Sequence, residues 1–484
     1  MKLLICESPN KTKKLASYLG SEFKVEASSG HIRDLPVKEM GIGPAPDYRP
    51  QYVVTDGSHK RVARLKKLAK ECDEIYLATD PDREGEAIAF HLIEALKLKS
   101  HKRVVFNEIT KAAVQKAVQS PGYLNEHLVK AQEARRVLDR LVGYRVSPAL
   151  SDKMGTNSSA GRVQSVAVRL VVERERAIQG FEATDHYNVN AYFEDESAGT
   201  WMATWDFSHL LNSGTDEDTE NPKLWTDKDK ADALVAAINA QPSFIVTNCQ
   251  QKKRQRKAPS AFTTSLLQQA ASSALKINPE TCMKLAQKLF EQGAITYHRT
   301  DSPNLSDEAI TAIRELVTGW EQAKGISGLL PEKPNRWKSK ADAQEAHEAI
   351  RPTDISQMQI DGLSPEEAAL YDLIWRRAVA SQMAPAVYDA TIINLLSDAH
   401  HQPFVAKGER LVFPGWRFLS KEDAVEQEKV DEDGAEEDQP LPLLNPGNRL
   451  DAIEASVKPT KTRPPARFTE ATLVKALESE GVGR

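Results

Sequence analysis

Cysteine is scarce: only four occur in 484 residues, and no two are spaced as a C-x-x-C pair. Neither a disulfide framework nor a zinc ribbon is therefore expected, and a reducing cytoplasm is the natural compartment. Long apolar runs are missing too. No segment approaches the roughly 18 apolar residues of a membrane helix, and the opening MKLLICESPNK has too short an apolar stretch for a signal peptide.

A large excess of charge of one sign is also lacking, because the net charge is only −5. Such a surface does not bind nucleic acid all over, so any DNA contact must come from local basic clusters. The sharpest cluster is KKRQRK at 252–257, which fits a DNA path or a solvated hinge equally well. The chain is 40% hydrophobic and 27% charged, as in ordinary globular protein, and its length suggests roughly three domains.

The apolar pattern changes several times along the chain. Strand and helix patterns alternate over the first 110 residues, with strands in LLIC, EIYLATD and RVVFNEIT, and predict an α/β domain with a mainly parallel sheet. Helical spacing follows from about 125 to 176, strands fill 182–256, and helices return from 262 to about 383. Strands reappear in TIINLLS and GERLVFPGWRFL, as if the chain re-enters a domain that it left near residue 256.

Three acids stand two residues apart at a predicted strand end: Asp80, Asp82 and Glu84 follow EIYLATD and precede a helix. Loops at the carboxyl ends of strands present side chains into a crevice, and hard oxygen ligands indicate Mg²⁺. Glu7 ends the first strand and is a candidate fourth acid. The alternative is an acidic loop that caps the helix. The string DPDREGEAIA resembles the TOPRIM metal-binding motif of topoisomerases, bacterial primases and some nucleases.

Tyr297 stands two residues before an arginine, just beyond a predicted helix. A helix ending near Gly293 is followed by AITYHRTDSPNLS, which sets Tyr297 just beyond it and Arg299 on the same side of an extended segment. A guanidinium there can hold a phosphate while a phenolate oxygen attacks phosphorus. The alternative is a packed core tyrosine. The string GAITYHRTDSPNLS closely resembles the active-site signature of type IA DNA topoisomerases.

Further segments resemble that family in the same order. ESPNKTKKL carries Glu7 and Lys11, and QEAHEAIRP, which carries His347, resembles a segment that faces the nucleophile. The resemblance also covers GHIRDLP, the helix QEARRVLDRLVGYRVSP and the loop SAGRVQS. It implies DNA contacts at His31, Arg135, Arg136, Asp139, Tyr144, Ser159, Ala160, Gly161, Arg162, Val163, Gln164 and Arg299. The ESP start resembles bacterial topoisomerase I more than topoisomerase III.

The sequence departs from the family pattern at a few places. Cys6, His298 and Pro303 replace an aliphatic residue, a commonly apolar neighbour of the tyrosine and a threonine, without removing a chemical group that the resemblance relies on. The chain stops at GVGR, where family members continue, and the family's zinc ribbons or basic tail are absent. We therefore expect a C-terminally truncated member that binds DNA and relaxes it weakly or not at all.

The resemblance implies a multidomain α/β protein with helical and strand-rich lobes that form a toroid. The expected lobes are a TOPRIM domain at 1–125, a DNA-binding domain at 126–181 and 457–484, a strand-rich arch at 182–256 and 385–456, and a helical domain at 257–384 that carries the tyrosine.

The implied activity is ATP-independent relaxation of negatively supercoiled DNA. Tyr297 forms a 5′-phosphotyrosine bond, Glu7 protonates the leaving oxygen, and Lys11 and Arg299 stabilise the phosphate. Mg²⁺ is expected on Glu7, Asp80, Asp82 and Glu84. Single-stranded or underwound DNA is the expected partner of a monomer in the nucleoid. The alternatives are a TOPRIM-type primase or nuclease and a non-catalytic DNA-binding remnant.

Overall fold

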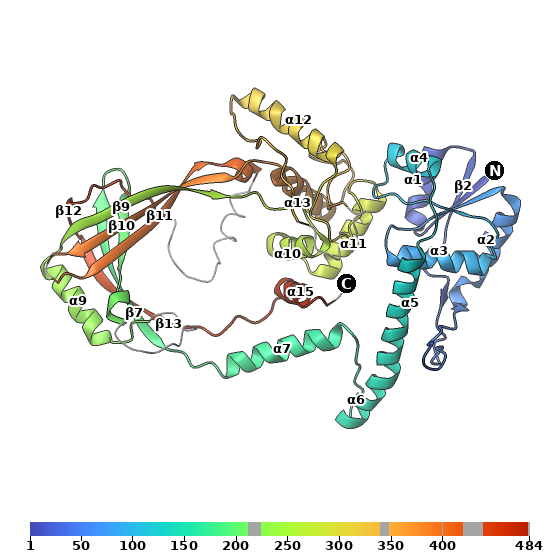
Figure 1. Ribbon diagram of the computed structural model, residues 1–484, viewed down its shortest axis with the longest axis horizontal. Helices are drawn as coiled ribbons and strands as arrows, with labels where there is room; N and C mark the ends of the chain where they lie inside the picture. The colour runs from blue at the N-terminus through green and yellow to red at the C-terminus, as the bar shows by residue number, and fades with distance from the viewer. Residues whose placement is uncertain (212–223, 339–347, 399, 420–438, 483–484) are drawn as a thin grey trace.

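The computed structural model describes the chain except for residues 212–223, 339–347, 399, 420–438 and 483–484. The elements gather into lobes that are arranged in a ring, with the sheet-rich arch at one end and the N-terminal lobe at the other (Figure 1). The predicted fold class, an α/β protein of helical and strand-rich lobes, is confirmed.

The N-terminal lobe is built on a parallel four-stranded sheet in the order β2-β1-β5-β6. Its strands are β1 (Lys2–Cys6), β2 (Phe23–Ala27), β5 (Glu74–Ala78) and β6 (Lys102–Arg103). Its helices are α1 (Pro9–Leu19), α2 (His59–Glu71), α3 (Arg83–Leu96) and α4 (Lys111–Gln119). Strands β1 and β5 are buried because they are apolar on both faces. Of the strand expected in RVVFNEIT, only Arg103 lies in β6, and the chain then leaves the sheet towards the tyrosine lobe, where the Asn107 carbonyl accepts the Tyr297 amide.

Three helices run from this lobe along one side of the ring (Figure 1). They are α5 (Glu126–Leu141), α6 (Ser147–Met154) and α7 (Gln164–Gln179). A π-helical turn, Val142–Val146, joins the first two without a break. Helix α7 buries none of its residues.

The arch is a seven-stranded sheet in the order β12-β9-β10-β11-β8-β7-β13. Its strands are β7 (Asp185–Asp195), β8 (Gly199–Trp205), β9 (Ser243–Arg256), β10 (Ala386–Ser397), β11 (Pro403–Phe413), β12 (Arg449–Asp451) and β13 (Glu454–Lys461). Helix α9 (Lys228–Ala240) packs on β7 and β13. Segments 182–256 and 385–456 thus share one sheet, as expected. The boundary placed at 456 falls inside β13, which stays paired with β7 to its last residue.

The basic cluster KKRQRK lies mostly within β9, which removes the hinge from the two alternatives left by the sequence. Its residues pair in register with β10, which makes this segment part of a rigid ladder. Arg254 and Arg256 both bind the Glu409 carboxylate of β11, at 2.8 Å each.

The tyrosine lobe lies between β9 and β10 in the sequence. It contains α10 (Thr264–Leu275), α11 (Pro279–Glu291), α12 (Asp307–Lys324) and α13 (Pro365–Ser381). Its core is continuous with one face of the N-terminal sheet, so the two lobes bury apolar surface together. The last helix, α15 (Glu470–Ser479), contacts α10. No helix in the described part of the chain is long and apolar enough to cross a membrane.

Candidate active site

The turn between β5 and α3 presents two carboxylates at the end of the sheet. Asp82 is the N-cap of α3, and its Oδ1 accepts the Gly85 amide at 2.7 Å. A Cβ at Gly85 would stand 2.1 Å from the Asp80 carbonyl oxygen, so only glycine allows the helix to start this close to the strand. The hydroxyl of Thr79 donates to the Gly85 carbonyl at 2.6 Å and closes the turn.

A buried arginine stabilises the same turn by binding its carbonyl oxygens. Arg103 of β6 donates to the carbonyl oxygens of Leu77, Thr79 and Asp80, at 2.9–3.1 Å. Its Nε binds the Glu86 carboxylate at 2.8 Å, and both side chains are almost fully buried. The sequence pattern did not single out Arg103, because an isolated arginine in an apolar strand carries no motif.

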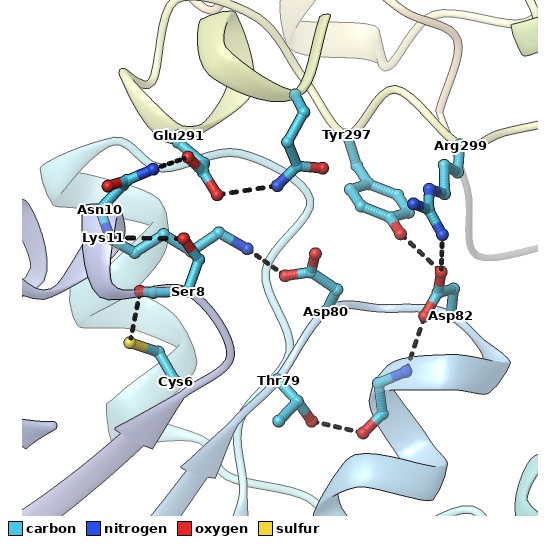
Figure 2. Close-up of polar contacts among 12 residues, drawn as sticks. Cys6, Ser8, Asn10, Lys11, Thr79, Asp80, Asp82, Glu291, Tyr297 and Arg299 are labelled. Atoms are coloured by element: carbon cyan, nitrogen blue, oxygen red, sulfur yellow. Dashed lines mark hydrogen bonds and ion pairs between the residues drawn. The ribbon is translucent and has the colours of Figure 1, made fainter. Parts of the chain in front are cut away.

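Tyr297 reaches this turn from the other lobe. Helix α11 ends at Glu291, and Gly293 adopts a left-handed φ of 66° that turns the chain towards the N-terminal lobe. The Tyr297 hydroxyl donates to Asp82 Oδ2 at 2.7 Å, and Arg299 lies 3.8 Å from the same oxygen. Figure 2 shows both side chains pointing at Asp82, as their two-residue spacing predicts.

Burial and nearby charge raise the pKa of the Tyr297 phenol above its ordinary value, because Asp82 and Asp80 disfavour a phenolate beside them. Tyr297 is 4% exposed, and its ring meets that of Phe290 edge to face at 5.2 Å. The nucleophile candidate is therefore held as a neutral phenol that donates to a carboxylate.

The acids behind Asp82 share one lysine. Lys11 is fully buried, binds Asp80 and lies 4.8 Å from the centre of the Phe290 ring. Burial raises the pKa of Asp80. Burial, and next the Asp80 charge, raise the pKa of Glu7 to about 7. Glu7 can therefore carry a proton near neutral pH, as a general acid must.

Glu84 has partners of its own. Glu84 accepts from His31 and from the Gln132 amide, each at 3.2 Å. The His31 contact holds the pKa of Glu84 below its ordinary value. Among the described residues, no three His, Cys, Asp or Glu side chains gather closely enough to hold a metal ion.

The donor chemistry nevertheless fits Mg²⁺. Glu7, Asp80, Asp82 and Glu84 line one groove and offer only hard carboxylate oxygens. Asp80 and Asp82 add to burial in raising the pKa of Glu7, so these carboxylates repel one another despite the nearby Lys11. A cation would relieve that repulsion.

The predicted DNA-contacting residues fall in two groups. His31, Arg135, Arg136 and Asp139 line a cavity of about 200 Å³ beside the acids. The Arg136 guanidinium forms two hydrogen bonds with Asp34, at 2.7 and 2.8 Å, so it is already occupied.

The second group lies further along the helices. Tyr144 is 40% exposed and donates to the Val37 carbonyl oxygen. Arg162 binds Asp139 at 3.0 Å and ties the 159–164 loop to α5.

Serine hydroxyls cover the backbone of the 159–164 loop. Ser147 accepts the Ala160 amide at 2.9 Å, and Ser165 accepts the Gly161 amide at 3.2 Å. The Gln164 amide group donates to Ser159 at 3.2 Å. The Ala160 and Gly161 amides therefore already have hydroxyl partners in this conformation. Val163 lines a groove, and His347 lies outside the described residues.

Two grooves meet at Asp82 and Arg299, and Tyr297 lines the first of them. One, of about 730 Å³, runs between the 7–10 and 29–30 segments and α11. The other, of about 980 Å³, runs between the turn at Asp82, α10 and α15. Arg299 and Asp82 line both, so an extended chain can pass over the phenol from one groove into the other.

Comparisons with known proteins agree with this arrangement. The DNA topoisomerase family model matches residues 123–484, and the Toprim domain model matches residues 2–109. The chain is 45% identical over its whole length to a plasmid DNA topoisomerase I of Xylella fastidiosa, of which it covers 71%. It is 41% identical to DNA topoisomerase 1 of Vibrio cholerae and 40% identical to that of Mycobacterium tuberculosis, again over its whole length. It covers 57% and 55% of those two proteins.

A solved structure, full-length topoisomerase I from Thermotoga maritima, matches the entire chain with a TM-score of 0.82 at 32% identity, and the match covers 76% of that protein. Fold and site together are those of a Toprim-containing DNA topoisomerase. Within that class, the chain belongs to the type IA family, close to bacterial DNA topoisomerase I. It spans little more than half the length of the Vibrio and Mycobacterium relatives.

Proposed function

We propose that this chain cleaves one DNA strand through a covalent bond between Tyr297 and the 5′ phosphate, lets a strand pass and rejoins the break, which relaxes negatively supercoiled DNA. The observation that carries the proposal is the 2.7 Å hydrogen bond from the Tyr297 hydroxyl to Asp82 across the two lobes. It sets a nucleophile beside a carboxylate that can accept its proton, next to Arg299.

The proton movements follow from the same contacts. Asp82 accepts the phenol proton as the Tyr297 oxygen bonds to phosphorus, and Glu7 donates a proton to the departing 3′ oxygen. Arg299, which is about half exposed, stabilises the charge on the phosphate. Lys11 is buried and does not reach the phosphate itself. It forms an ion pair with Asp80 and so lowers the negative charge that the incoming phosphate meets.

Magnesium belongs to the proposal through the carboxylates of Glu7, Asp80, Asp82 and Glu84. When bound there, it would supply positive charge that positions the phosphate for rejoining. The chain's own residues carry cleavage, so chelation is expected to slow rejoining far more than cleavage.

Single-stranded or underwound DNA is the proposed substrate. Arg135 lines both the cavity and the groove that reaches Asp82 and Arg299, and His31 lines the cavity, so both are placed to follow a phosphate backbone. We further propose that the chain works as a monomer in the bacterial cytoplasm, at the nucleoid, because one chain supplies every group named here.

The decisive experiment is to trap the covalent adduct. A single-stranded oligonucleotide labelled at its 3′ end should leave its label on the denatured protein, whereas a 5′ label should not. Tyr297→Phe should remove the adduct, since the ring stays but the attacking oxygen is lost. A label transferred only from the 5′ end would place the chain among 3′-linking enzymes.

The same experiment separates the alternatives. A TOPRIM primase or nuclease would cut or extend DNA without Tyr297, so Tyr297→Phe would keep full activity. A non-catalytic remnant would bind DNA and form no adduct with the wild-type chain.

A further inference from the structure

The nucleophile's backbone is held from both lobes at once. The Tyr297 amide donates to the Asn107 carbonyl oxygen of the N-terminal lobe at 2.7 Å. On its own side, Thr296 exchanges hydrogen bonds with Arg351: the Thr296 amide donates to the Arg351 carbonyl at 2.8 Å, and the Arg351 amide donates to the Thr296 hydroxyl at 2.9 Å. The position of Tyr297 against Asp82 thus depends on how the 107–108 segment meets the 349–351 segment.

One ion pair joins those two segments. Arg351 Nη2 lies 3.1 Å from Glu108 Oε2, and the two side chains are 8% and 22% exposed. The other carboxylate oxygen of Glu108 accepts the Thr110 hydroxyl at 2.9 Å, which fixes the orientation of the group. A pair held this rigidly and this far from solvent has a defined geometry, unlike an exposed pair.

Arg351 also keeps a second carboxylate within its own lobe. It binds Glu348 through Nε and Nη2. When the lobes separate, Glu108 therefore leaves, while the guanidinium still has a partner. The cost of opening the contact is limited because no buried cation is left unpaired.

We propose that Glu108 and Arg351 form a positioning pair that aligns Tyr297 with Asp82 when the lobes close and that releases when they part. The inference rests on the proposed strand cleavage by Tyr297. Neither side chain reaches the reacting atoms. The pair acts through the backbone, because Glu108 follows Asn107, the acceptor of the Tyr297 amide, and Arg351 holds Thr296.

Single-turnover cleavage of a labelled oligonucleotide tests this, with Glu108→Gln as the variant. The amide keeps the shape and the contact with Thr110 but loses the charge that attracts Arg351. We expect cleavage at saturating DNA to slow about tenfold, with little change in the DNA concentration for half-maximal rate and in the melting temperature. Glu108→Asp, which restores the charge, should recover part of the rate.

Glu348→Gln is the matched control, because it removes the charge of the partner that Arg351 keeps within its own lobe. It should lower the melting temperature and leave the cleavage rate near that of the wild type. The proposal is overturned if Glu108→Gln cleaves at the wild-type rate, if both variants slow cleavage equally, or if the rate falls only in step with the melting temperature. Absence of an adduct with the wild-type chain would instead refute strand cleavage itself.

Discussion

Asp80 and Asp82 stand two residues apart and have different tasks. Asp80 neutralises Lys11, which has no exposed surface, whereas Asp82 accepts the Tyr297 hydroxyl. Asp80→Ala leaves a buried ammonium without its partner and should lower the free energy of unfolding by about 3–5 kcal/mol. Asp82→Ala mainly removes a helix cap, at about 1 kcal/mol, but should abolish most cleavage. Urea denaturation and adduct yield measured on both variants check this contrast, and equal losses of stability would contradict it.

The protonation of Glu7 predicts a pH dependence. Because its pKa is raised to about 7, the protonated form that donates to the leaving oxygen predominates below pH 7 and is lost as the pH rises through that value. Cleavage rates without added Mg²⁺ should therefore fall up to about tenfold per pH unit above 7.

Two variants control the pH experiment. Glu7→Gln should be slow at every pH. Glu280→Gln, an exposed acid on the same groove whose pKa is lowered by Lys284, should keep the wild-type profile. A rate that rises with pH through 7 would show that Glu7 acts as a base.

Adjacent arginines on α5 should differ in DNA binding. Arg135 lines both the cavity and a groove, whereas Arg136 must first give up its two bonds to Asp34. Arg135→Gln should reduce the slope of log K against log salt by about 0.7, the value of one phosphate contact on a single strand. Arg136→Gln should leave the slope nearly unchanged. Fluorescence anisotropy at several salt concentrations measures both slopes, and a larger change for Arg136 would reverse the assignment.

At the scale of elements, the start of α3 depends on one glycine. Gly85→Ala brings a Cβ against the Asp80 carbonyl, so the β5–α3 turn must shift. We expect a loss of about 3 kcal/mol or more, together with loss of cleavage. Gly319→Ala in the middle of α12 meets nothing within 4 Å and should instead gain about 0.5–1 kcal/mol. Thermal unfolding of both variants tests this, and a stable, active Gly85→Ala protein would be the contrary result.

The sequence predicted those elements in which local pattern and packing agree. The β5 turn, the end of α11 at Gly293 and the shared direction of Tyr297 and Arg299 follow from strand ends, a helix-ending glycine and two-residue spacing. Whether KKRQRK forms a hinge could not be decided from the sequence: its side chains are largely exposed, as their charge indicates, whereas its β-ladder with β10 comes from residues far along the chain.

Contacts between lobes were beyond the reach of sequence reasoning. Glu108 and Arg351 meet across 243 positions, and Arg103 is recognised only by the carbonyl groups around it. Neither the Glu108–Arg351 pair nor the contacts of Arg103 leave a periodic pattern or a motif in the sequence. The hydroxyl contacts of Ser147 and Ser165 with the 159–164 loop likewise depend on how two helices pack.

At the scale of the whole molecule, strand passage requires the two lobes to part. Asn10 and Glu291 face each other across the interface at 2.7 Å. Replacing both by cysteine and joining them with a short bismaleimide should leave oligonucleotide cleavage intact and reduce plasmid relaxation relative to the untreated variant.

The native cysteines must not react with the cross-linker. Cys72 and Cys249 would be changed to serine. Cys6 and Cys282 are buried, and burial raises the pKa of each thiol to about 12, which makes both inert. Unchanged relaxation after cross-linking would exclude this interface as the gate.

The chain enters and leaves the tyrosine lobe on the neighbouring strands β9 and β10, and it enters and leaves the arch on the paired strands β7 and β13. Each lobe is therefore inserted into the preceding one at a single place. The covalent path around the ring has one gap, between the tyrosine lobe and the N-terminal lobe (Figure 1). Side-chain and amide contacts bridge it. Topologically the polypeptide is an open clamp, so a DNA segment admitted through that gap never becomes linked with the protein chain and can leave by the way it came.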